Sequence, residues 1–381
     1  MPRWTDTLRF AALVAAFFAL YALTAQRGLG WGDSGEFQYR ILACPDGVLG
    51  GCESFAVAHP LYVALGKLLC RTPFQVTLLS SFFGALAVGG LFLCTRRAGL
   101  AVLFGLSHML WWLSCLAEVQ TMNLAFLAFE TFLLLRFFET GRRPWLLAAC
   151  FLTGVHLSCH NFALLAAPAL LVLLARAGLR TFLLAAGAGC LGAAWWFHAL
   201  FIRGFGDVLV GRFGAKVAGM LPTNGLETLF NLALAALSFV VPAALFWWNR
   251  RNRQTDGDAT RRLVLRTLFA THALFFVRYF VPDQATFLLP TLFFAYVLLP
   301  RAEMKSARLV ALAALQILLP ICAGLVLREL PAPARQTTHP YRDDATYFAH
   351  PWKFDETSAA RCAAETDGAW TGYPPLGQAG W

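Results

Sequence analysis

Two carboxylates lie close together near the start of the chain, in the stretch "GWGDSGEF" from Gly30 to Phe37. Asp33 and Glu36 are three residues apart and share one face if a helix begins after Gly32. Such a pair can supply a general base and a second acid that holds a substrate or metal. The alternative is a capping box, in which Asp33 or Ser34 starts a short interfacial helix and Glu36 closes its first turn. The glycines also fit G-x-G-x-x-G, but an apolar run precedes them where a dinucleotide loop needs a strand.

Three histidines carry further chemistry. His156 and His160 stand four residues apart in "HLSCHN", followed by Asn161. That spacing alone allows zinc, but nothing nearby supplies further ligands, and a polar helix break that lines a cavity is the alternative. His59 in "AHPLY", three residues before Tyr62, precedes a proline that biases it away from helix. His59 therefore either binds phosphate or pins the loop.

Other charged residues stand at the ends of apolar runs. Glu118 in "AEVQTMN" separates two runs with almost no loop, so it either faces water or points into the same cavity as Asp33. Arg278 and Asp283 in "RYFVPDQATFLLP" are either a snorkelling arginine beside a turn or a cation for a lipid-linked phosphate beside a carboxylate that orients it. Arg203 opens a Gly-rich, basic segment that suits a loop or short helix at the lipid surface.

The composition identifies the elements that must position these residues. Of the 381 residues, 58% are hydrophobic and 14% charged. Apolar runs of about 20 residues recur, long enough to cross a hydrocarbon core of roughly 30 Å. Because lipid cannot satisfy backbone polar groups, these runs must be helices, so we expect an all-α polytopic membrane protein. About eleven spans are predicted, at 9–26, 75–94, 98–117, 119–137, 144–157, 161–175, 181–202, 227–248, 265–281, 285–300 and 309–327.

The charge pattern predicts the orientation. The net charge is +10, but the basic residues lie between apolar runs, which indicates topology and not nucleic-acid binding. They fall on one side if the N-terminus is cytoplasmic. The acids and histidines then gather on the outer face, with a first outer loop at 27–74. We expect a transmembrane domain at 1–328 and a short extracytoplasmic tail at 329–381 that docks on the outer face. A disulfide between Cys44 and Cys52 is plausible if that compartment is oxidising.

A series of motifs carries a family resemblance. "WGDSGEF", "AHPLYVALGKLL", "VTLLSSFFGALAVGGLFL", "AEVQTMNLAFLAF", "HLSCHNFALLAAPALLVLL" and "FVPDQATFLLPTLFF" follow one another in this order. Over roughly residues 20–300 the chain resembles bacterial multi-span proteins whose eukaryotic relative is an endoplasmic-reticulum protein O-mannosyltransferase. These proteins are similar in turn to the GT-C class of glycosyltransferases, which take sugars from polyprenyl phosphates. The family's "HPPGYPLY" is shortened to "HPLY" here, so the shape of that loop differs.

The resemblance implies a function and a site. In this class a catalytic acid follows the first helix, which points to Asp33, with Glu36 second and Glu118 as the acid of the next outer turn. The base takes a proton from an acceptor hydroxyl on a protein or glycan, and direct attack on the sugar, mannose being one candidate, inverts the anomeric centre. Arg278, Arg203 or His59 would stabilise the leaving polyprenyl phosphate, with or without a divalent metal. Substrate-binding candidates are Glu118, His59, Tyr62, His156, His160, Asn161, Arg203, Arg278 and Asp283.

Two other classes compete. A transporter or flippase of lipid-linked sugars also needs outer-face cations and a cavity, but it predicts polar residues through the membrane midplane, where these runs are poor in them. A structural subunit of an envelope assembly would use the acids only as caps. The resemblance favours an enzyme of the bacterial inner membrane whose active site faces outward.

Overall fold

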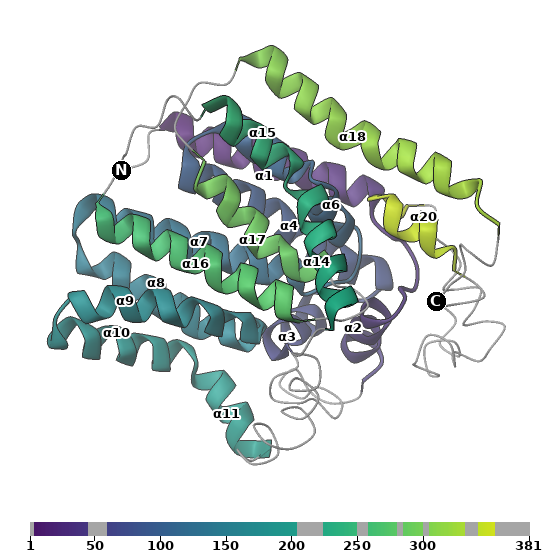
Figure 1. The fold of residues 1–381 in the computed structure, drawn as a ribbon. Coiled ribbons are helices and arrows are strands. Elements are labelled where there is room, and N and C mark those ends of the chain that lie inside the picture. Colours follow the sequence, from purple (N-terminus) through teal and green to yellow (C-terminus); the bar gives the residue numbers. More distant parts are fainter. Residues whose placement is uncertain are drawn as a thin grey trace.

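The computed structural model describes residues 4–44, 59–203, 224–249, 258–279, 285–299, 305–331 and 342–354. Within these ranges the chain forms helices and no strand (Figure 1). This agrees with the all-α architecture expected from the apolar runs.

Five helices pack side by side in one row, in the order α1, α4, α7, α8 and α10 (Figure 1). Their bounds are Trp4–Thr24, Pro73–Thr95, Gln120–Thr140, Arg143–Cys159 and Leu179–Gly192. Small residues bring α8 and α10 into backbone contact. A Cβ at Gly154 would lie 2.1 Å from the Gly189 carbonyl oxygen, and one at Gly192 would lie 2.1 Å from that of Phe151. Such glycines are the usual means of close helix packing in membranes.

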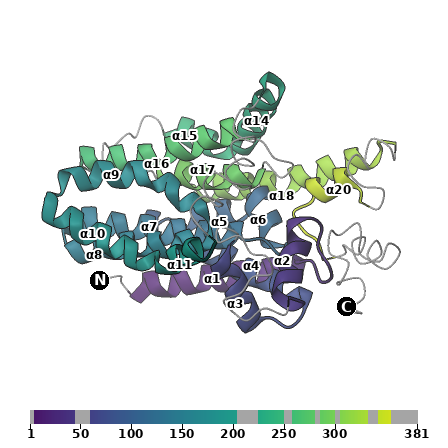
Figure 2. The ribbon, with the colours of Figure 1, turned by 90° about the horizontal axis from the view of Figure 1, so that it is seen from below.

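A second layer covers this row (Figure 2). It contains α9 (Ala167–Arg176), α16 (Ala259–Arg278) and α17 (Ala285–Val297), with α16 between the other two. α14 (Gly225–Ser238) and α15 (Val240–Asn249) lie outside α16 and α17, and α11 (Ala194–Arg203) continues from α10.

Four of the expected spans are interrupted. The span at 98–117 divides into α5 (Ala98–Gly105) and α6 (His108–Ser114), and the span at 161–175 begins with the 3-10 turn η1 (Asn161–Ala166). The span at 181–202 divides between α10 and α11, and the one at 227–248 bends by 55° between α14 and α15. Prolines explain two of these breaks, because Pro168 and Pro242 stand near the start of the following helix, where a missing N–H is tolerated.

Among the described helices, four are long and apolar enough to cross a membrane, or five if α14 and α15 count as one bent span. The four are α1, α4, α7 and α18 (Ser306–Arg328). Each of the eleven expected segments contains helix within the described residues, but eleven complete spans remain a prediction. α1 and α18 expose large apolar side chains such as Leu8, Leu23, Val310 and Leu318, as helices in contact with lipid do.

Two short helices lie at one end of the bundle, α2 (Asp33–Leu42) and α3 (Pro60–Leu69). α7 begins and α8 ends at this same end, which we call the motif end (Figure 1). α20 (Asp344–Ala349) packs against α18 near by. Cys44, just after α2, is disulfide-bonded, whereas Cys52 lies outside the described residues.

Candidate functional site

The glycines of the "GWGDSGEF" stretch are explained by the backbone. A Cβ at Gly30 would lie 2.5 Å from the Ser34 Cβ, so the chain can turn tightly into α2 only with glycine there. Gly32, the N-cap of α2, has a φ of +54°, a conformation that glycine adopts readily. The buried Gln38 side chain then fastens the loop, because it accepts from the Gly30 N–H at 2.8 Å and donates to the Gly28 carbonyl at 3.1 Å.

The two acids have different surroundings. Asp33 is the first residue of α2 and is exposed, whereas the Glu36 carboxylate lies 3.7 Å from the guanidinium of Arg40, which is buried. The N-cap Gly32 offers no side chain and Glu36 faces Arg40, so the capping box is not formed. The role of Arg40 was not predicted from the sequence, although its i, i+4 spacing from Glu36 indicates an ion pair.

His59 and His160 form a pair of contacting rings beside α2, with their planes tilted by 32°. Their ring centroids are 4.7 Å apart, and the His59 ring also meets the edge of Phe37, at 5.6 Å. His59 Nδ1 lies 2.9 Å from the Cys159 carbonyl oxygen, which can only accept, so Nδ1 carries a proton. Phe162 N–H donates to His160 Nδ1 at 3.0 Å. Because that nitrogen accepts, the His160 ring is neutral.

A chain of buried polar side chains continues from His160 along α7 and α8. His160 Nε2 is 3.1 Å from the side-chain amide of Gln120, which is joined to the Asn123 amide by a hydrogen bond of 3.1 Å. Asn123 meets His156 Nε2 at 2.6 Å, and His156 Nδ1 meets Glu130 at 2.8 Å. Gln120, Asn123 and Glu130 were not predicted; the acid inside the apolar run of α7 was the available signal.

The zinc reading of "HLSCHN" does not fit these contacts. All four ring nitrogens of His156 and His160 are occupied by protein partners. The described residues also contain no group of three or more His, Cys, Asp or Glu placed to hold a metal. The polar helix break, the alternative reading, describes this segment better, because His160 ends α8 and begins η1.

Tyr62 is joined to the backbone of Glu118 through Ser80. The Tyr62 hydroxyl and Ser80 Oγ are 2.8 Å apart, and Ser80 Oγ donates to the Glu118 carbonyl at 2.8 Å. Tyr62 is fully enclosed, and its ring contacts Phe37 at 5.0 Å. Tyr62 thus stabilises the junction of α2, α3 and α4, and its binding of substrate remains a prediction.

The remaining candidates come from the second layer and α11. Asn161 Oδ1 accepts from Trp196 of α11 at 3.2 Å, which ties α11 to η1. Arg278 is exposed at the end of α16, where the buried Asn231 donates to the Phe276 carbonyl at 3.1 Å. Arg203 ends α11, but its side chain lies outside the described part of the structure, as does Asp283.

The segment 342–354 packs directly on the motif end. The Arg342 guanidinium lies over the rings of Trp31, Tyr347 and Phe348, at 5.8, 4.7 and 5.4 Å from their centroids. Trp112 of α6 donates to the Tyr347 carbonyl at 2.9 Å, and Lys353 N–H donates to the Thr24 carbonyl at 2.7 Å. This part of the tail thus docks on the bundle, next to the carboxylate motif.

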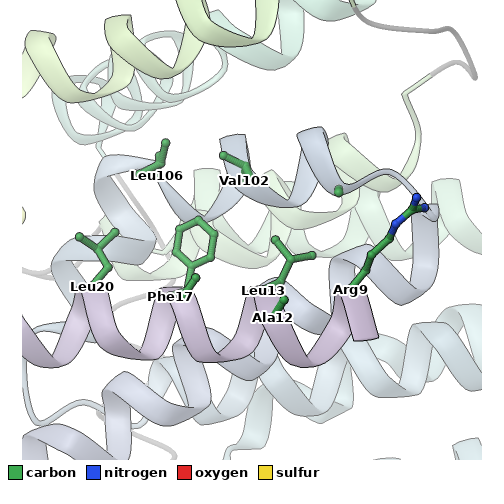
Figure 3. Close-up of a pocket in the computed structure, with 9 residues that line it drawn as sticks. Arg9, Ala12, Leu13, Phe17, Leu20, Val102 and Leu106 are labelled. Atoms are coloured by element: carbon green, nitrogen blue, oxygen red, sulfur yellow. The ribbon is translucent and has the colours of Figure 1, made fainter. Parts of the chain in front are cut away.

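An apolar groove between α1 and α5 is separate from this cluster (Figure 3). Its volume is about 390 Å³, and apolar side chains line it except for Arg9 at one end. Arg9 belongs to the opposite half of α1 from the motif, about 20 Å from Thr24 along the helix. The groove contains no group that could act as an acid or base, so we do not assign the site to it.

No family model and no curated protein sequence matches this chain. A solved structure that is similar is that of ArnT from Cupriavidus metallidurans bound to undecaprenyl phosphate. The TM-score is 0.62 at 15% sequence identity, and the match covers 90% of this chain and 67% of that chain. The chain has a GT-C-like fold. Together with the long apolar helices, this fold identifies an integral membrane protein.

Proposed function

We propose that this chain transfers a sugar from a polyprenyl-phosphate donor to a hydroxyl of a protein or glycan acceptor, on the outer face of a bacterial inner membrane. The observation that carries the proposal is the fold shared with ArnT bound to undecaprenyl phosphate. The exposed carboxylate of Asp33 at the motif end supports it, because a base for a hydroxyl acceptor must be reachable from water while the donor's lipid stays in the bilayer.

The chemistry assigns a task to each acid. Asp33 takes the proton of the acceptor hydroxyl, whose oxygen attacks the anomeric carbon while the bond from that carbon to the phosphate oxygen breaks. A single displacement of this kind inverts the anomeric centre. Glu36 pairs with Arg40 and keeps this buried guanidinium fixed in α2. Mannose is one candidate for the sugar.

The leaving polyprenyl phosphate gains negative charge and needs cations near it. The candidates for these cations are Arg278, at the end of α16, and Arg203, at the end of α11. The described residues offer no group of three or more potential ligands for a divalent metal, so we assign no metal ligands here. The proton transfer to Asp33 needs only its carboxylate.

The test is a transfer assay with purified protein in lipid nanodiscs. Polyprenyl-phosphate sugars, mannose among them, serve as donors, and the anomeric configuration of the product is determined by NMR. We expect Asp33→Asn to reduce transfer by more than about 100-fold and Glu139→Gln, at the far end of α7, to behave as wild type. Full activity of Asp33→Asn would contradict the proposed base.

A transporter of lipid-linked sugars is the second candidate, because the chain from His160 to Glu130 places polar groups deep between α7 and α8. Movement of lipid-linked sugar across liposomes in the absence of any acceptor, without transfer when an acceptor is added, would favour that candidate over the enzyme.

A further inference from the structure

The His59 ring is held so that one nitrogen is occupied and the other is open. Nδ1–H donates to the Cys159 carbonyl at 2.9 Å. No hydrogen bond to Nε2 is formed within the described residues. His59 as a whole residue is half-buried, at the edge of the cluster.

Several features keep the ring neutral. Burial lowers the pKa of His59 to about 4, and the positive charge of Arg40 acts in the same direction. The Cys159 carbonyl opposes them only in part. His160, whose ring contacts that of His59 at a centroid distance of 4.7 Å, is itself neutral because its Nδ1 accepts from Phe162 N–H. Nε2 of His59 therefore presents a lone pair at neutral pH.

This state changes the role expected of His59. A neutral imidazole supplies no positive charge, so in this state His59 offers an acceptor and not the cation expected for phosphate. A lone pair without a partner in the protein suits a hydrogen-bond donor without charge, and the abundant donors of this kind in a sugar-transfer reaction are hydroxyl groups.

The place of His59 fits such a contact. Its ring touches Phe37, which is one helical turn from Asp33 on the same face of α2. His59 also has a φ of +62°, unusual for a residue with a side chain. That conformation turns the chain into α3 while Nδ1–H stays on Cys159.

We propose that His59 is a substrate-positioning residue whose Nε2 accepts a hydrogen bond from a sugar hydroxyl next to Asp33. The inference rests on the proposed transferase function and assigns to this position a neutral, hydroxyl-bearing group instead of the donor phosphate. The hydroxyl belongs either to the donor sugar or to the acceptor, and kinetics with each substrate varied in turn distinguish the two.

Three substitutions separate the lone pair from the other properties of His59. Asn can retain the donor to the Cys159 carbonyl and tolerates a positive φ, but it removes Nε2. Gln places an amide near the position of Nε2, and Lys supplies the cation that phosphate binding would need. His198→Asn on α11 is the control, because His198 is exposed and has no part in the cluster.

We expect His59→Asn to raise KM for one substrate about ten-fold, the size of one lost hydrogen bond. His59→Gln should show a smaller increase in KM than His59→Asn, whereas His59→Lys should show no such improvement. A deoxy analogue that lacks the bound hydroxyl should bind wild type and His59→Asn equally. Unchanged kinetics of His59→Asn, or wild-type activity of His59→Lys, would overturn the inference.

A second measurement does not depend on transfer. The protein is labelled with 15N-histidine, and the NMR signals of His59 are assigned by their absence from the spectrum of His59→Asn. Between pH 6 and 8 these signals should show a neutral ring that is protonated on Nδ1. A cationic ring at pH 7 would overturn the inference even if the enzyme is active. Absence of transfer by wild type would instead overturn the proposed function, and this inference with it.

Discussion

His156 Nδ1 lies 2.8 Å from Glu130 Oε1, and both side chains are buried between α7 and α8. Removal of one partner leaves the other as a buried polar group without its bond, which costs about 1–3 kcal/mol. We therefore expect Glu130→Ala to lower the thermal unfolding temperature in detergent, and Glu130→Gln to lower it less because an amide can still bond to the imidazole. Equal shifts for the two variants would contradict this.

The division of labour in α2 predicts unequal effects of the two acids. Asp33→Asn should reduce kcat by more than 100-fold, at the lower end of the 10²–10⁴-fold range of a general base. Glu36→Gln keeps a polar amide beside Arg40, where the carboxylate now lies 3.7 Å away, so we expect a loss of less than ten-fold. A larger loss for Glu36→Gln would make Glu36 the base.

The tight turn before α2 predicts a sharp contrast between neighbouring glycines. Gly30→Ala places a Cβ 2.5 Å from that of Ser34, so the loop must shift and Asp33 with it. Gly28→Ala meets nothing within 4 Å and is the matched control. Transfer activity should fall at least ten-fold in the first variant and stay unchanged in the second, because small displacements of a catalytic group reduce rates steeply.

The lowered pKa of His59 predicts how stability depends on pH. The pKa is about 4 in the folded protein and about 6.5 when unfolded, so the unfolded state binds more protons between these values. Stability is then full above pH 6.5 and falls as the pH drops toward 4. From pH 7 to 5 we expect a loss of about 1–2 kcal/mol, which His59→Asn should lack. Parallel pH profiles of the unfolding temperature for wild type and variant would contradict the assignment.

Docking of the C-terminal segment depends on a glycine of α18. A Cβ at Gly324 would lie 1.8 Å from His350 Nε2. We expect Gly324→Ala to loosen the segment 342–354 and increase its cleavage in limited proteolysis. Gly187→Ala in α10, where nothing lies within 4 Å, should leave the cleavage rate unchanged.

The helical segments could be predicted because each is an apolar run with the length of a span, as in α4 and α18. The breaks within apolar runs were harder to predict from the sequence. In the run 98–117, for example, α5 ends where Ser107 Oγ donates to the Phe104 carbonyl, and hydropathy does not encode such a contact. Hydropathy also cannot distinguish a helix that crosses the membrane from a shorter apolar helix such as α10.

The candidate site could likewise be predicted only in part from the sequence. The pattern around Asp33 identified a loop and a short helix, but the partner of Glu36 depended on Arg40 turning inward. The Gln120 and Asn123 amides become part of a chain only because α7 and α8 align them with His156 and His160. Such contacts join residues up to 40 positions apart, so they require the fold.

Arg342 covers Trp31, and more than three hundred residues separate the two in the chain. A ribosome adding about 5–20 residues per second needs roughly 15–60 s to make that stretch. During this time the carboxylate motif has already been synthesised while its covering segment has not. Trp31 is therefore covered only after the residues up to Arg342 have been made, and a chain that terminates before Arg342 would leave Trp31 without that cover.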